Sequence, residues 1–226
     1  ALTPSIFHSA PEIVGTSLFG VFLNALSGTY AYVKQHRVYF KAAIPFAIAT
    51  LPGAILGSLV SDYFTGPTFS LSYGIFILII SAIMYWNSSN KKAIATNFDE
   101  TLFIARKKLG IILSMFVGFI SSIFGIGGGI IHVPVMIYAL AFPPHMATAT
   151  SHFVLAVSSF MGVTSHIFLN HIVWIPALAV GFGAVIGAQI GARLSKKTKP
   201  RSIILLLCIS LFLLGIRMIV ESNLLF

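Results

Sequence analysis

The stretch Gly125-Ile126-Gly127-Gly128-Gly129 interrupts an apolar part of the chain at a point where neither flank can cross a bilayer alone. Residues 110–124 and 130–142 contain no Lys, Arg, Asp or Glu, yet each run is shorter than the ~20 residues that a spanning helix needs. Membrane proteins tolerate unsatisfied backbone only where it lines a cavity or a bound polar solute. A helix break at this depth therefore predicts a binding site.

The composition sets the environment of this break. The chain has 226 residues, of which 57% are hydrophobic and 8% charged, and its mean hydropathy is +0.97. These values predict an integral membrane protein. The net charge of +9 does not indicate nucleic-acid binding, because Lys and Arg fall in short clusters between apolar runs. The one cysteine, Cys208, excludes a disulfide within the chain.

The apolar runs predict an all-α fold with six full spans and one broken unit. The expected helices are 12–33, 39–63, 68–86, the broken unit 109–142, 145–169, 172–194 and 202–220. The polar segment 87–108 is expected to be a linker between a first transmembrane repeat, residues 1–86, and a second, residues 109–226. The chain opens at Ala1, and we expect the amino-terminal hairpin of the first repeat to be missing or truncated.

The basic segments predict the orientation, because Lys and Arg in short loops stay on the cytoplasmic side. Segments 34–41, 87–108 and 193–201 are basic, whereas the loops at 62–67 and 170–171 contain no Lys or Arg. A single crossing by 109–142 would place 193–201 outside. The charges agree if this unit instead enters and returns on the cytoplasmic side as a hairpin bent at the glycines.

An internal repeat emerges when the chain is shifted on itself by 134 residues. The shift places Thr16 on Thr150, Ser17 on Ser151, Phe19 on Phe153, Gly28 on Gly162, Gly53 on Gly187 and Gly57 on Gly191. The basic loop near Lys34 falls on the uncharged loop near Asn170, so the two copies have opposite orientations. Inverted repeats around a midplane site made by broken helices are a transporter architecture.

Several motifs together resemble the TauE/SafE family of sulfite exporters and organosulfur-anion permeases. They are GIGGG followed by Val133-Pro134, Phe142-Pro143-Pro144-His145, Thr148-Ala149-Thr150-Ser151, the GAxxGA motif at 187–192 and, in the first half, Thr3-Pro4-Ser5, Pro11, Gly15-Thr16-Ser17 and GAILGS at 53–58. The resemblance covers nearly the whole chain and implies a membrane transporter for a small sulfur-containing anion. The family's first Gly-rich segment, which should precede Thr3-Pro4, is absent from this sequence.

The glycine break suits an anion. If a half-helix starts after the glycines, its free N–H groups lie at the positive end of a helix dipole, where anions bind. Hydroxyls at the start of the neighbouring helices add neutral donors. The expected substrate-binding residues are Gly127, Gly128, Gly129, Ile130, Thr150, Ser151, Thr16, Ser17, His132 and Asn24. His132 is the candidate for proton coupling or substrate contact. Gly53, Gly57, Gly187 and Gly191 are instead expected to serve helix packing.

These features predict a secondary transporter that carries a small anion, sulfite or an organosulfur compound, by alternating access. An anion channel or a non-transporting membrane scaffold is the alternative. All five acidic residues lie at span ends or in loops, so neither an enzyme nor a metal site is expected, and no cofactor is implied. The expected partners are the anion, the lipid of the plasma or inner membrane and a coupling ion, either proton or sodium. Both a monomer and a homo-oligomer are compatible with the sequence, and no nucleic acid is expected as a partner.

Overall fold

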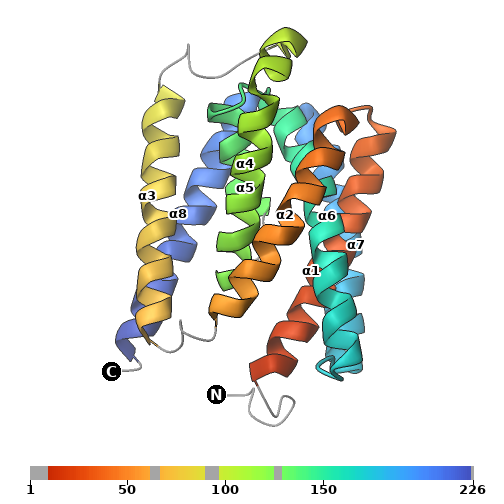
Figure 1. Ribbon diagram of the computed structural model, residues 1–226, viewed down its shortest axis with the longest axis vertical. Coiled ribbons are helices and arrows are strands. Elements are labelled where there is room, and N and C mark those ends of the chain that lie inside the picture. The colour runs from red at the N-terminus through yellow and green to blue at the C-terminus, as the bar shows by residue number, and fades with distance from the viewer. Residues whose placement is uncertain (1–9, 62–66, 90–96, 125–128, 225–226) are drawn as a thin grey trace.

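The computed structural model describes residues 10–61, 67–89, 97–124 and 129–224, and across these ranges it contains helices and no strand (Figure 1). The helices are α1 (Ala10–Lys34), α2 (Phe40–Ser61), α3 (Pro67–Ser89), α4 (Glu100–Phe124), α5 (Gly129–Tyr138), α6 (Pro144–Phe168), α7 (Trp174–Lys197) and α8 (Pro200–Leu224). The protein is therefore all-α, as the sequence predicts. The predicted boundaries agree within a few residues except at the start of α4.

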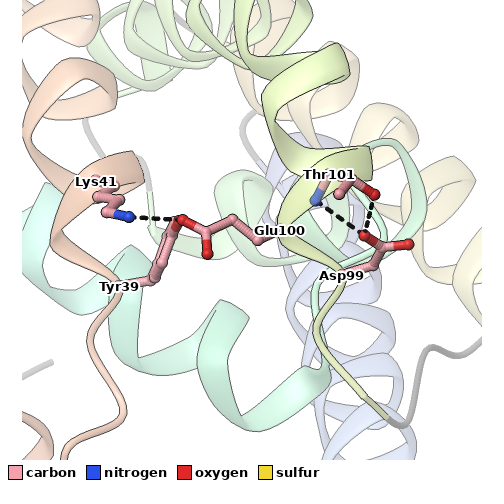
Figure 2. A network of polar contacts seen from close by, with 5 residues as sticks. All are labelled: Tyr39, Lys41, Asp99, Glu100 and Thr101. Atoms are coloured by element: carbon pink, nitrogen blue, oxygen red, sulfur yellow. Dashed lines mark hydrogen bonds and ion pairs between the residues drawn. The ribbon is translucent and has the colours of Figure 1, made fainter.

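Residues 100–108 of the segment expected to be a linker form the first turns of α4, because Asp99 caps this helix. Asp99 Oδ1 accepts hydrogen bonds from the Thr101 N–H at 2.9 Å, the Thr101 hydroxyl at 2.6 Å and the Leu102 N–H at 3.1 Å. The bond from the Thr101 hydroxyl is the main reason that the pKa of Asp99 lies below its usual range. On the other side of this helix start, Lys41 reaches Glu100 at 2.6 Å (Figure 2).

Large apolar side chains cover the outer surface of the bundle. Ile175, Trp86 and Phe182 are 84%, 82% and 71% exposed. In the described part of the chain, three helices are long and apolar enough to cross a membrane, namely Pro144–Phe168, Trp174–Lys197 and Pro200–Val220, and 40–56 and 71–87 form shorter apolar helices. An apolar exterior of this kind belongs in lipid, so the helices form a multi-pass membrane bundle.

The bundle is built from helix pairs. α3 and α8 lie side by side on one flank, α1, α6 and α7 form the other flank, and α2, α4 and α5 lie between them (Figure 1). The main apolar core fills this middle region. It includes Phe46 of α2, Ile77 of α3, Met136 of α5 and Ile204 of α8, all of which are fully buried.

The broken unit folds back on itself. Arg106 of α4 donates to the Ala139 carbonyl at 2.9 Å just after α5, and Ser114 lies 2.9 Å from His132 near the start of α5. These contacts make α5 antiparallel to α4. α5 has 10 residues, about 15 Å at ~1.5 Å per residue, roughly half the hydrocarbon thickness. The chain thus descends along α4 and returns along α5 to the end of the bundle where α4 begins.

The offset of 134 residues relates the two halves of the fold as well as of the sequence. It carries the start of α1 onto that of α6 and the start of α2 onto that of α7. It also relates two unusual backbone conformations, His36 at φ 56° and Asn170 at φ 55°. Both residues follow the end of a helix, where a left-handed residue turns the chain into the next helix.

The same offset relates two hydrogen bonds at opposite ends of the bundle. The Tyr39 N–H donates to Thr150 Oγ1 at 3.2 Å, and the Val173 N–H donates to Thr16 Oγ1 at 3.0 Å. Each bond joins the start of one half's first helix to the loop that ends the other half's first helix. α1 and α6 therefore run antiparallel. Reciprocal contacts of this kind are what an inverted repeat requires.

The glycines expected to serve packing divide into two groups. A Cβ added at Gly53 would meet the Met115 carbonyl of α4, so Gly53 permits the close approach of α2 and α4. A Cβ added at Gly187 or Gly191 would meet nothing within 4 Å, so the packing interpretation is wrong for these two residues within the described structure. α7 presents them on its exposed surface. Gly57 lies where side-chain surroundings are not described.

The basic segments gather at one end of the bundle. Arg37, in the α1–α2 loop, donates to Ser195 Oγ at 3.2 Å, and Lys41 pairs with Glu100 at the start of α4. The loop that contains Asn170 lies at the other end, beside the start of α1. The grouping agrees with the positive-inside pattern read from the sequence.

Candidate functional site

The start of α5 is the candidate site. α5 begins at Gly129, so the N–H groups of its first turn have no acceptor within the helix and lie at the positive end of its dipole. This helix end lies inside the bundle, packed against α4 and α6. Gly127 and Gly128, two of the predicted donors, lie outside the described residues. Ile130 lies in the first turn of α5, as predicted.

α6 brings one of the predicted hydroxyls, that of Ser151, to this helix start, whereas the Thr150 hydroxyl accepts the Tyr39 N–H of the α1–α2 loop. The Ser151 hydroxyl donates to the Gly129 carbonyl at 3.3 Å, and both Thr150 and Ser151 are buried. α6 also explains the glycine at position 129. A Cβ there would lie 3.1 Å from Leu155 Cδ2, closer than side chains ordinarily pack. Glycine thus lets the first turn of α5 approach α6.

A buried polar pair lies one turn further along α5. His132 Nε2 is 2.9 Å from Ser114 Oγ of α4, and the side chains are 1% and 0% exposed. The ring packs edge-on against Phe46 of α2, with centroids 5.8 Å apart. The approach of Phe46 depends on Gly110, because a Cβ at Gly110 would occupy the space of the Phe46 ring.

Ser114 was not among the predicted site residues. Its signal in the sequence was one of three serines in the charge-free run that precedes the glycines. That signal is weak, because serines in membrane helices commonly bond back to their own helix, and Ser114 does so at 2.7 Å to the Gly110 carbonyl. Only the fold shows that His132 lies opposite.

The predicted residues of the first half do not join this group. Thr16 accepts the Val173 N–H at the opposite end of the α1–α6 pair. Thr150 contacts Tyr39, just beyond the end of α1 at Lys34. The part of α1 between Thr16 and Lys34 is roughly 27 Å long at ~1.5 Å per residue, so a similar distance separates the two threonines. The expectation that Thr16 and Thr150 face one anion is therefore not met. An in-plane two-fold axis keeps equivalent residues at equal depths on opposite sides of the midplane, and both threonines lie near a helix start.

The remaining predicted residues of α1 lie along this helix, away from α5. Ser17 is exposed beside Thr16, and Asn24 is half-buried near the middle of α1. His152 of α6 was not predicted to be a site residue, and it packs against α1. Its Nδ1 lies 3.2 Å from the Thr148 carbonyl, and its ring lies edge-on to Tyr32.

A separate cavity lies at the basic end of the bundle, between α1 and α7. It has a volume of about 600 Å³ and is lined by Tyr30, Ala31, Lys34, Gln35, Gln189, Arg193, Lys196 and Lys197. None of the predicted site residues lines it. The described side chains that contact the start of α5 include no Lys or Arg, and Arg106 contacts the chain at the other end of α5, just after Tyr138.

Comparisons with known proteins point to transport. The family model described as Sulfite exporter TauE/SafE matches residues 1–218. Probable membrane transporter protein YunE of Bacillus subtilis is 35% identical over 224 residues, which cover 94% of this chain and 82% of the relative. Probable membrane transporter protein MJ0441 of Methanocaldococcus jannaschii is 29% identical over 216 residues, 91% of this chain and 78% of the relative. No solved structure matches the chain.

Proposed function

Because the chain belongs to the TauE/SafE family of membrane transporters, we propose that it carries a small oxyanion, sulfite or an organosulfur compound, by alternating access. The anion binds at the start of α5. The N–H groups of the first turn, which includes Gly129 and Ile130, provide hydrogen bonds and the positive end of the helix dipole. The Ser151 hydroxyl of α6, which donates to the Gly129 carbonyl in this structure, turns its hydrogen to the anion.

The observation that carries this proposal is a helix start that lies inside the bundle without a cation beside it. In the described structure, the polar side chains bonded to one another or to the backbone at the first turns of α5 include Ser151, His132 and Ser114, and none of these is Lys or Arg. A fixed Lys or Arg in a low-dielectric interior would hold an anion strongly. Neutral donors bind weakly enough for release, which a transporter needs as much as it needs binding.

The arrangement of the halves favours a carrier over a channel or a scaffold. Reciprocal bonds from Thr16 and Thr150 link the halves at opposite ends of the bundle. Two halves related in this way can rock against each other and expose a central site to each side in turn. A scaffold has no use for a helix start inside the bundle whose first N–H groups have no acceptor within the helix.

A binding panel with two glycine variants tests the site. Sulfite, thiosulfate, methanesulfonate and acetate are compared by the thermal shift that each causes in purified protein. We expect stabilisation by the sulfur oxyanions that follows RT ln(1 + [L]/Kd). Gly129→Val should abolish it, because a branched side chain would collide with Leu155 and cover the first turn.

Gly183→Val is the matched control, because a Cβ at Gly183 meets nothing within 4 Å. This variant should respond to the anions as the wild type does. Equal responses from both variants would move the binding site away from α5. The absence of any shift with every anion in the wild type would refute the proposed substrate class.

A further inference from the structure

We propose that His132 Nδ1 is a proton-binding site that couples anion transport to proton transport, with Ser114 as the residue that positions the ring. The inference rests on the proposed anion site at the start of α5. It deepens that proposal by naming the coupling ion. The proton comes from water on one side of the membrane, occupies the Nδ1 lone pair while the anion is bound, and returns to water on the other side.

The hydrogen bonds of Ser114 assign the protonation of the ring. The hydroxyl has one hydrogen, which it donates to the Gly110 carbonyl at 2.7 Å. Its oxygen therefore accepts from His132 Nε2 at 2.9 Å, so Nε2 carries the proton of the neutral ring. The other nitrogen, Nδ1, is left with a lone pair.

This lone pair has no partner among the described residues. His132 Nδ1 is buried and accepts no hydrogen bond. Buried polar atoms are rarely left unpaired, since each costs free energy, and an exception in a native fold calls for an explanation. A proton-binding site explains the unpaired atom, because Nδ1 is then filled by a proton only at one stage of the transport cycle. Proton binding at Nδ1 leaves the bond from Nε2 to Ser114 intact, so the ring need not move.

The surroundings make protonation depend on the anion. The titratable or charged groups on α5 and the elements packed around it are Glu100, Arg106, Lys107 and Lys108 of α4, His145, His152 and His166 of α6, Lys41 of α2, Tyr73 and Tyr85 of α3, Tyr138 of α5, and Arg201, Cys208, Arg217 and Glu221 of α8. Of the two carboxylates among them, Glu100 is held by Lys41 at the far end of α4, and Glu221 lies near the end of α8. A protonated His132 therefore has no carboxylate partner in the described structure.

A bound anion supplies the missing partner. The start of α5 carries partial positive charge less than one turn from His132, and this charge opposes protonation while the site is empty. An anion at the first turn reverses the local field and favours the imidazolium. The effect is reciprocal, because a proton that binds better in the presence of the anion makes the anion bind better by the same factor. Anion and proton thus cross together.

Proteoliposomes with an imposed pH gradient test the coupling. We expect the wild type to accumulate labelled sulfite when the external medium is acidic and to exchange sulfite when no gradient is present. His132→Gln keeps an amide donor for Ser114 but cannot take up a proton. Its gradient-driven accumulation, taken relative to its own exchange rate, should fall at least tenfold below that of the wild type.

The control is His152→Gln, which changes a buried histidine of α6 whose Nδ1 already has a partner in the Thr148 carbonyl. It should accumulate sulfite as the wild type does. Full accumulation by His132→Gln would overturn the proposal, because the proton would then travel on the anion itself. A wild type that does not exchange sulfite would instead count against the proposed function.

A spectroscopic readout tests the site without transport. In protein labelled with ¹⁵N-histidine, the His132 signals, identified by their loss in His132→Gln, should show the neutral Nε2–H tautomer without anion and the imidazolium with sulfite at the same pH. Ser114→Ala should move the midpoint of the pH profile of transport to lower pH by about one unit, and Ser114→Thr should restore it. An Nδ1–H tautomer, or no change on adding sulfite, would contradict the assignment.

Discussion

Ser151 and Ser17 are equivalent in the repeat but have different surroundings. Ser151 is buried and bonded to the first residue of α5, whereas Ser17 is exposed at the far end of the bundle. The repeat in the sequence predicted equal roles for them. Their positions in the fold predict that only the serine beside α5 contacts the anion.

Two alanine substitutions separate these roles. Ser151→Ala should weaken anion binding by about 1 kcal/mol, roughly fivefold in Kd, the usual loss for one neutral hydrogen bond. Ser17→Ala should leave the affinity unchanged. Calorimetry on both purified variants measures the effect. An equal loss from Ser17→Ala would show that the first half contributes to the same site in a conformation other than the one described.

At the scale of single residues, the sequence predicted His132 and Ser151, which lie at the first turns of α5, and missed Ser114, while the predicted Thr150 contacts Tyr39 instead. Hydrophobic periodicity places residues on a helix, and it does not say which face of a distant helix lies opposite. The different depths of Thr16 and Thr150 in the membrane were not predicted, for a related reason. The shift of the chain on itself gave their equivalence but not their distance from the symmetry axis.

At the scale of elements, the apolar runs were sufficient to place every helix, because spans of this length and hydropathy have few alternatives in a membrane. The start of α4 was missed because its first turns are polar and project past the apolar run. The sequence contains the capping residue in Asp99-Glu100-Thr101, but the polar composition of 87–108 led to the prediction of a linker there. The half-helix α5 was predicted from the glycines and from the charge pattern.

The contact between α2 and α4 gives a prediction for these elements. Gly53→Ala should destabilise the protein by roughly 1–3 kcal/mol, because its Cβ would press on the backbone of α4. Gly187→Ala occupies the equivalent position of α7 and meets nothing, so it should be neutral or slightly stabilising. Thermal unfolding in detergent compares the two. A larger loss from Gly187→Ala would mean that α7 packs against a further helix.

At the scale of the whole molecule, α1 and α6, which begin the two expected repeats, are antiparallel, and the described basic segments lie together at one end. Lys197 and Leu169 are exposed at opposite ends of α7 and its preceding loop. In a Cys208→Ser background, Lys197→Cys should react with an impermeant thiol reagent from the cytoplasmic side and Leu169→Cys from the outside. Leu169 is preferred to Asn170 because the φ of 55° at Asn170 would strain a cysteine.

Labelling of both cysteines from the same face would contradict the inverted arrangement of the halves. Labelling from opposite faces, with Lys197→Cys outside, would keep the arrangement and reverse the orientation of the bundle. The sequence predicted the orientation through charge alone. The fold adds the bonds that bring the basic loops together, such as Arg37 to Ser195.

Counterflow exchange in proteoliposomes tests most directly whether this bundle carries an anion at the start of α5. Vesicles loaded with labelled sulfite should release the label faster when unlabelled sulfite is added outside, and the rate should saturate as external sulfite rises. Gly129→Val should abolish this stimulation, and Gly183→Val should preserve it. Release that rises linearly with sulfite, without stimulation from the other side, or equal exchange by the two variants, would contradict the account.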